Sequence, residues 1–177
     1  PMAFPNAELV DAEQAMQAAR RIKTPEEVAA LRSALVIAEK GLAAGVAALS
    51  AGTSEKILAG AILEAEAAGG VSTPATQDAA WLTSKQHPWR RAEGDGRVRD
   101  GDLVVLSAGV LADGYVAEVA RTLVVGEPSD AVTALYRRRD ELWDRLVAAC
   151  RPGATTSTLL DAYQQAGEAL PAMPVAH

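Results

Sequence analysis

Apolar residues recur every three or four positions over two long stretches of the chain, a spacing that predicts two long helices. At the start of the first stretch, Thr24 occupies the expected N-cap, Pro25 the first helical position and Glu27 the third. Together they form a capping box, which satisfies main-chain N–H groups that the first turn would otherwise leave unbonded. The helix is expected to end at Gly52. It is expected to bury one face, formed by Val28, Leu31, Leu35, Ala38, Leu42, Val46 and Leu49.

The second long helix is predicted to begin at Pro128-Ser129-Asp130 and to end at Gly153. Trp143 is expected to pack along it, and its apolar face is formed by Val132, Leu135, Tyr136, Leu142, Leu146 and Val147. Arg137, Arg138 and Arg139 are interpreted as a solvated turn of this helix rather than as a binding groove.

Three shorter helices are also predicted. One covers Asp11 to Arg21, and one is capped by Thr53 or Ser54 and stopped by Gly69-Gly70. The last is capped by Thr155, Thr156 or Ser157 and runs to about Leu170. A long helix, a Gly-Thr loop and a shorter capped helix thus occur twice, which suggests two related halves, although such loops are ordinary cap chemistry.

Between the helical stretches the pattern changes to that of strands. Residues 71–83 look extended, and residues 84–101 are polar and rich in turn-forming glycines. The apolar run Leu103–Leu106 and the segment Tyr115–Val125 flank Asp113-Gly114, which is a strong hairpin signal.

The bulk composition narrows the function classes. The net charge of -6 argues against nucleic acid as a partner, which would normally require a basic face. The single cysteine, Cys150, excludes an intrachain disulfide and is consistent with a cytoplasmic location. No apolar run of ~20 residues predicts a membrane span, and residues 1–15 do not have the pattern of a signal peptide.

Several short motifs in this order resemble the creatinase/aminopeptidase ("pita-bread") family of Xaa-Pro peptidases, M24. They are Arg21-Ile22-Lys23-Thr24-Pro25-Glu26-Glu27, Gly101-Asp102-Leu103-Val104, Asp113-Gly114-Tyr115, Arg121-Thr122, Val125-Gly126-Glu127-Pro128 and Gly153-Ala154-Thr155. Each is weak alone, but together they span most of the chain.

The resemblance implies an α+β fold: a curved antiparallel sheet flanked by helix pairs, in two pseudo-symmetric halves, incomplete at the C-terminus. Residues 1–20 are then a linker or the end of an upstream domain, and residues 21–177 are a partial pita-bread domain. The resemblance also implies a site in which two Asp, one His and two Glu hold two ions of Mn, Co or Zn. Many members of the family form homodimers.

Two of the implied ligand positions are altered in this chain. Ser107 stands where the family has its first Asp, and Glu118, eleven residues later, stands at the second. A neutral hydroxyl is a poor metal ligand, so the site is expected to be degenerate. From the residues alone, Ser107 is more simply a buried strand serine bonded to the backbone than a nucleophile, because no His-Asp pair can be placed beside it.

The resemblance also suggests His87 as the histidine that contacts the substrate and His177 as the metal-binding histidine, with the two ligand Glu residues lying beyond His177. Trp81, Trp89 and Tyr115 are candidates to line a peptide cleft. With Glu118 and His177 as the only retained ligands, a catalytic ion would be held too weakly, since even an open zinc site uses three protein ligands.

Three functions remain open. The first is a metal-free member that needs no cofactor and uses its cleft to bind a peptide or a protein. The second is an active metal-dependent Xaa-Pro aminopeptidase or dipeptidase. The third is a metal-independent, creatinase-like hydrolase of small amidino compounds, which depends on His87.

Overall fold

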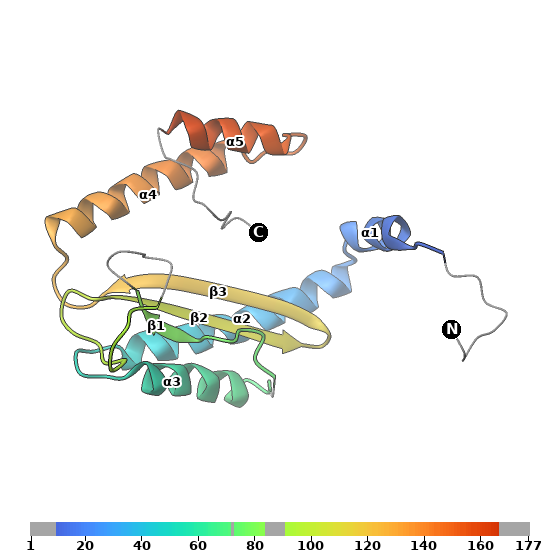
Figure 1. Ribbon diagram of the computed structural model, residues 1–177. Coiled ribbons are helices and arrows are strands. Elements are labelled where there is room, and N and C mark those ends of the chain that lie inside the picture. The colour runs from blue at the N-terminus through green and yellow to red at the C-terminus, as the bar shows by residue number, and fades with distance from the viewer. Residues whose placement is uncertain (1–9, 72, 84–90, 167–177) are drawn as a thin grey trace. The chain divides into compact units, whose positions relative to one another are not determined.

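A computed structural model describes residues 10–71, 73–83 and 91–166, and its elements follow the predicted order (Figure 1). The helices are α1 (Glu13–Arg21), α2 (Pro25–Ala48), α3 (Glu55–Ala68), α4 (Asp130–Ala149) and α5 (Thr156–Gln165). The strands are β1 (Ala80–Leu82), β2 (Leu103–Ala112) and β3 (Tyr115–Val124). The chain divides into two units, residues 1–125 and residues 126–177.

The predicted start of α2 is confirmed. Thr24 accepts a hydrogen bond from the main-chain N–H of Glu27 at 3.3 Å, and the Glu27 carboxylate accepts one from the main-chain N–H of Thr24 at 2.7 Å. Ser54 caps α3 and Ser129 caps α4, each by accepting a hydrogen bond from a main-chain N–H three residues on. Local sequence is sufficient for these helix starts because each cap acts within one turn.

The three strands form one antiparallel sheet in the order β1-β2-β3. The predicted hairpin is confirmed, with both turn residues at positive φ, 50° at Asp113 and 81° at Gly114, as a type I′ turn requires. β2 is longer than the apolar run Leu103–Leu106 suggested, because the small residues that follow it continue the ladder as far as Ala112. Within the segment 71–83, which was expected to be extended, strand β1 covers Ala80–Leu82.

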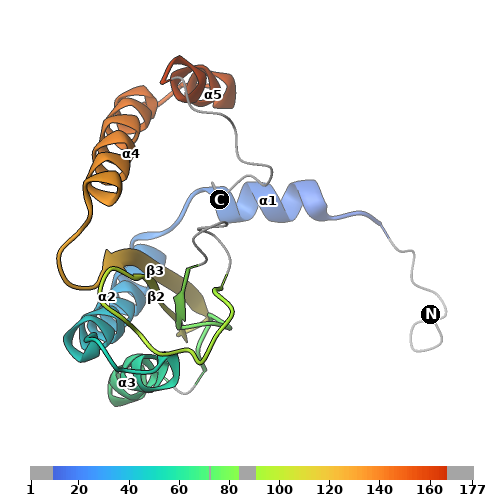
Figure 2. The ribbon, with the colours of Figure 1, turned by 60° about the vertical axis from the view of Figure 1, so that its left-hand side comes forward.

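Helices α2 and α3 cover one face of this sheet (Figures 1 and 2). Alternate residues of β2 point into the core between sheet and helices. The largest fully buried side chains are Leu58, Ile62, Leu106, Val98, Val104 and Val110. The opposite face of the sheet carries the residues at odd positions of β2, among them Ser107.

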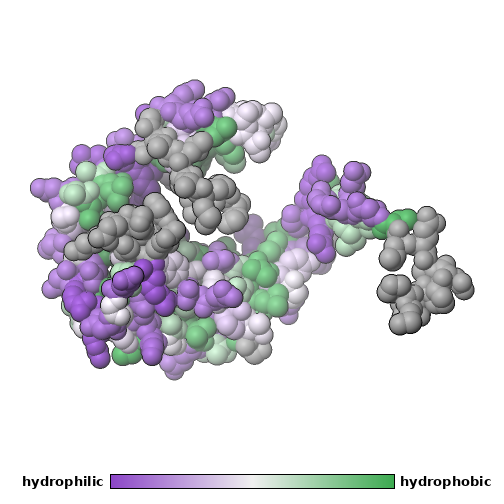
Figure 3. Space-filling model, viewed as in Figure 1, coloured by the Kyte–Doolittle hydropathy of each residue, from purple (hydrophilic) through white to green (hydrophobic). Residues whose placement is uncertain are grey.

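The predicted buried face of α2 is confirmed at Ala38 but is wrong at other positions. The buried residues are Ala34, Ala38, Gly41 and Gly45. Val28 and Leu35, which were expected inside, are each 39% exposed, and Figure 3 shows apolar surface along α2. Small residues face the core because α2 packs closely on α3: a Cβ at Gly45 would lie 2.7 Å from Ile62 Cγ1.

The second unit contains α4 and α5, and none of its described residues, 126–166, is buried. Trp143, which was expected to pack along α4, is 64% exposed. None of the helices in the described ranges is both long and apolar enough to cross a membrane. The division into a linker (1–20) and a pita-bread domain (21–177) stays a prediction.

Candidate functional site

The β2–β3 hairpin brings the two altered ligand positions together. Gly109 pairs with Glu118, and Ser107 pairs with Ala120, so Ser107 and Glu118 are diagonal neighbours on one face of the sheet. The Ser107 hydroxyl donates a hydrogen bond to Glu118 Oε1 at 3.0 Å. The eleven-residue spacing noted in the sequence is therefore a direct contact across the hairpin.

Ser107 is only 3% exposed, whereas Glu118 is exposed. The prediction that Ser107 is a buried strand serine is confirmed, but its hydroxyl bonds to a side chain and not to the backbone. Its one proton is directed at Glu118, so what the pair can offer a ligand is oxygen lone pairs. Such an arrangement suits hydrogen-bond donors such as peptide N–H groups.

Trp81 lies on the same face of the sheet. It pairs with Val105, which is two residues from Ser107, and it is half-buried. The Trp81 indole, the Ser107 hydroxyl and the Glu118 carboxylate thus come from three adjacent strands and share one face of the sheet. This arrangement is consistent with Trp81 lining a cleft together with the other two residues.

Tyr115 lies on the opposite face, toward α2. Its hydroxyl donates a hydrogen bond to Glu27 Oε1 at 2.8 Å, and this bond raises the pKa of the Tyr115 hydroxyl. The pKa of Glu27 is lowered, chiefly by the main-chain N–H of Thr24 and then by Tyr115. The observed contact of Tyr115 thus ties the hairpin to the start of α2, and its predicted contact with substrate has no support from this geometry.

His87, Trp89 and His177 lie outside the described residues, so their predicted roles stay predictions. Among the residues that the structure describes, no three His, Cys, Asp or Glu side chains gather closely enough to hold a metal ion. A two-metal centre needs ions ~3.5–4 Å apart and bridged by fixed carboxylates. On the described face, the groups that could bind a metal ion are the Glu118 carboxylate and the Ser107 hydroxyl, which is already hydrogen-bonded to that carboxylate. These two groups do not fit a two-metal centre.

One buried acid was missed by the sequence analysis. Glu66 is 3% exposed and lies on the core side of α3, in line with Leu58 and Ile62. The three residues are spaced by four, so the available signal was an acid continuing an apolar helix face. Burial raises the pKa of Glu66, while a hydrogen bond from the main-chain N–H of Gly109 acts in the opposite direction.

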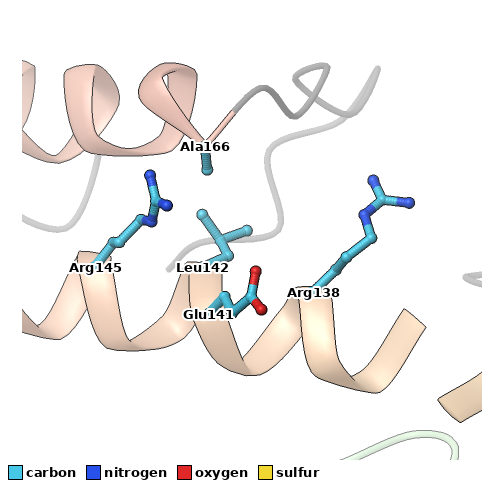
Figure 4. A pocket seen from close by; sticks show the side chains of 5 residues that line it. All are labelled: Arg138, Glu141, Leu142, Arg145 and Ala166. Atoms are coloured by element: carbon cyan, nitrogen blue, oxygen red, sulfur yellow. The ribbon is translucent and has the colours of Figure 1, made fainter. Parts of the chain in front are cut away.

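A separate open hollow lies in the second unit, between α4 and α5 (Figure 4). It is lined by Arg138, Glu141, Leu142, Arg145 and Ala166. Arg145 donates a hydrogen bond to the main-chain carbonyl of Gln165 at 3.5 Å, close to the end of α5. The lining contains two positively charged residues, Arg138 and Arg145, and one negatively charged residue, Glu141. This combination does not indicate a particular class of ligand.

Comparison with known proteins agrees with this architecture. Residues 29–172 match the profile of the metallopeptidase family M24, and the chain therefore belongs to that family. The Xaa-Pro dipeptidase of Pyrococcus furiosus is 30% identical over 140 residues, which cover 79% of this chain and 40% of the relative. The Xaa-Pro dipeptidase of Lactobacillus helveticus is 27% identical over 88% of this chain and 43% of the relative.

Solved structures point the same way. The prolidase from Pyrococcus furiosus superposes with a TM-score of 0.76 at 28% identity, covering 87% of this chain and 46% of that one. An X-Pro aminopeptidase from Thermotoga maritima reaches a TM-score of 0.79 over 93% of this chain and 47% of that one, at 24% identity, which speaks for the fold alone. The α+β pita-bread fold expected from the sequence is confirmed. The chain spans about two fifths of the length of the curated relatives that it matches.

Proposed function

We propose that this M24 protein uses the Ser107–Glu118 face to bind a peptide or a protein segment without a pair of metal ions. The observation that carries the proposal is the 3.0 Å hydrogen bond from Ser107 to Glu118. Ser107 and Glu118 stand at the two positions where the resemblance implies the first two carboxylate ligands of the metal ions. A hydroxyl bonded in this way supplies no negative charge to offset two divalent cations.

Each residue of the face has a part in such binding. Glu118 and the lone pairs of Ser107 accept hydrogen bonds from N–H groups of the ligand, and Trp81 offers an aromatic surface for an apolar side chain. Neither a nucleic acid nor a membrane is among the proposed binding partners. A homodimer and a cytoplasmic location belong to the same proposal.

Metal analysis of the full-length protein tests the proposal. After exposure to Mn²⁺, Co²⁺ or Zn²⁺ and removal of excess ion, we expect far less than one ion per chain. The matched variant carries Ser107→Asp and Glu118→Asp, which return both positions to the residues that the resemblance implies, and it is expected to retain more metal. Two ions per chain in the unaltered protein would overturn the proposal.

The second candidate is an active metal-dependent Xaa-Pro peptidase. It is favoured by the relatives, which are named Xaa-Pro dipeptidases. Hydrolysis of several Xaa-Pro dipeptides by the full-length protein with Mn²⁺ or Co²⁺, compared with a chelated control, separates the two. Metal-dependent turnover would favour this candidate, and equal background rates would count against it.

A further inference from the structure

Glu55 is the first residue of helix α3, but its carboxylate is bonded to a strand. Glu55 Oε1 accepts a hydrogen bond from the main-chain N–H of Leu82 in β1 at 2.7 Å. Only 14% of the Glu55 side chain is exposed. An acid in the first turn of a helix already stabilises that helix through its dipole. This carboxylate also reaches a residue 27 positions further along the chain, so it joins α3 to the sheet.

Strand β1 is an edge of the described sheet and has only three residues (Figure 1). Its ladder bonds to β2 include one accepted by the Ala79 carbonyl and one donated by the Thr83 N–H, each at 2.9 Å. Because the residues that bond to a partner strand alternate along an antiparallel strand, the main-chain groups of Ala80 and Leu82 point away from β2. On an edge strand such groups have no ladder partner.

Side chains and a loop supply partners to this outer edge of β1. Glu55 accepts the hydrogen bond from the Leu82 N–H, and Arg91 Nη2 donates one to the Ala80 carbonyl at 3.4 Å. The main-chain N–H of Ala92 donates to the Leu82 carbonyl at 2.8 Å. Three outward main-chain groups of β1 are therefore bonded, although no further strand of the described sheet lies beside them.

The Glu55 carboxylate is itself held on its other side. Its Oε2 lies 3.8 Å from Arg91 Nη1, and Arg91 Nη2 lies 3.1 Å from Asp78 Oδ1. A Cβ at Gly96 would lie 3.3 Å from Glu55 Oε2, so the loop at Gly96 approaches the carboxylate closely. Exposed ion pairs contribute little by themselves, and the Arg91 side chain is 49% exposed. We therefore expect the less exposed contact, from Leu82 to Glu55, to matter most.

Trp81 stands between the two residues whose outward groups are bonded. The side chains of these neighbours, Ala80 and Leu82, enter the core and are 3% and 7% exposed. Successive side chains of a strand point to opposite faces, so the indole lies on the face of Ser107 and Glu118. Its direction follows the twist and register of a three-residue strand, which the bonds on the outer edge help to fix.

We propose that Glu55 is a positioning residue for Trp81, acting through the main chain of β1 at Leu82 and supported by Arg91. The bond to Leu82 fixes how β1 lies on the sheet and thereby where the indole stands beside Ser107. The inference rests on the proposed function only in taking this face as the binding site. Its readout is the surroundings of the indole in the protein without ligand, so loss of positioning and loss of peptide binding are separate results.

Fluorine NMR of the full-length protein labelled with fluorotryptophan tests the proposal. Trp81→Phe identifies the Trp81 resonance, and a spectrum in denaturant marks its position without fixed surroundings. Glu55→Ala removes the acceptor for Leu82 and is expected to move the resonance toward the denatured position. Glu55→Gln keeps an oxygen that accepts from Leu82, so the resonance is expected to stay close to that of the unaltered protein. Arg91→Met is expected to give a smaller shift than Glu55→Ala.

Matched controls separate positioning from general damage. Glu26→Ala removes an acid from the first turn of α2 and is expected to leave the Trp81 resonance in place. Arg97→Met removes an arginine that donates to the main-chain carbonyl of Gly52, outside β1, and is expected to do the same. Trp143 lies on α4 in the second unit and provides an internal reference that no variant should move.

A second variant covers the case in which Glu55→Ala does not fold. Glu55→Asp keeps the charge at the helix start but draws the carboxylate back by one methylene group, so it is expected to lose the bond to Leu82 and to shift the Trp81 resonance.

Two results would overturn the proposal. One is a folded Glu55→Ala or Glu55→Asp protein with an unmoved Trp81 resonance, which would leave Glu55 with a role in the start of α3 alone. The other is a shift in Glu55→Gln as large as that in Glu55→Ala, since the bond to Leu82 would then not be what holds the indole.

Discussion

Single residues in this protein owe their roles to contacts across the sheet rather than along the chain. Ser107 and Glu118 meet because the two-residue turn at Asp113-Gly114 places Gly109 opposite Glu118. Tyr115 stands on the other face, where its hydroxyl bonds to Glu27. Side chains that point to opposite faces alternate along a strand, so a shift of one residue would exchange these roles.

The titration of Glu66 gives a prediction at this scale. Burial raises its pKa above the ordinary value of 4.5, and no charged neighbour is among the causes of the shift. The folded state therefore holds this proton more tightly than the unfolded state does. Its contribution to stability is complete below the ordinary pKa and is lost as pH rises through the folded pKa.

We accordingly expect Glu66→Gln, which carries no titrating group, to gain stability relative to the unaltered protein as pH rises from 4 to 8. The measurement is the free energy of unfolding by chemical denaturation at each pH. Glu64→Gln, which changes an exposed residue of the same helix, is the matched control. A flat difference for Glu66→Gln would contradict the burial argument.

At the scale of elements, the start of a helix is determined by nearby residues, whereas its buried face is determined by packing against other elements. The starts of α2, α3 and α4 are set by Thr24, Ser54 and Ser129, each within one turn. The buried face of α2 is set by its fit to α3 and β2, where glycine and alanine allow close approach. Hydrophobic spacing alone therefore selected large residues that are exposed, such as Val28 and Leu35, and among the buried small residues it identified only Ala38.

The cap of α2 gives a prediction with a built-in control. Thr24→Ala removes the acceptor for the Glu27 N–H and should lower the free energy of unfolding by about 1 kcal/mol. Thr155 also stands at an N-cap, that of α5, but makes no side-chain cap hydrogen bond, so Thr155→Ala should cost clearly less. Equal losses in the two variants would show that the capping contact of Thr24 contributes nothing special.

At the scale of the whole molecule, the two units differ in what stabilises them. Residues 1–125 enclose the buried core, whereas the described residues 126–166 contain no buried side chain. Helix propensity alone leaves helices shorter than about 12–15 residues marginal in water, and α5 has 10 residues. Among the described residues, α4 and α5 therefore have no buried core of their own to stabilise them.

We expect a peptide of residues 126–177 to show little helix by circular dichroism in dilute buffer. Trp143 in that peptide should have the fluorescence emission of a solvated indole, consistent with its 64% exposure. A helix-favouring cosolvent provides the control, because it should raise the helix signal if the segment is only marginal. A peptide that is fully helical in plain buffer and unfolds cooperatively would contradict this expectation.

Much of this protein follows from local sequence. The order of the elements, three helix caps, the hairpin turn and the family motifs could all be predicted, because each depends on residues within a few positions of one another. With a two-residue turn, even the pairing of Gly109 with Glu118 follows from the numbering. The order of these motifs was also sufficient to recognise the resemblance to the M24 family, which the match over residues 29–172 confirms.

Only the tertiary structure could decide which surfaces meet. Glu66 is buried because α2 offers Gly41 at its side, a residue 25 positions away from it in the sequence. Ser107 directs its proton at Glu118 rather than at the backbone, because the hairpin register places the carboxylate 3.0 Å from its hydroxyl. Local sequence determined the elements, and packing between distant segments determined which of their polar groups became a site.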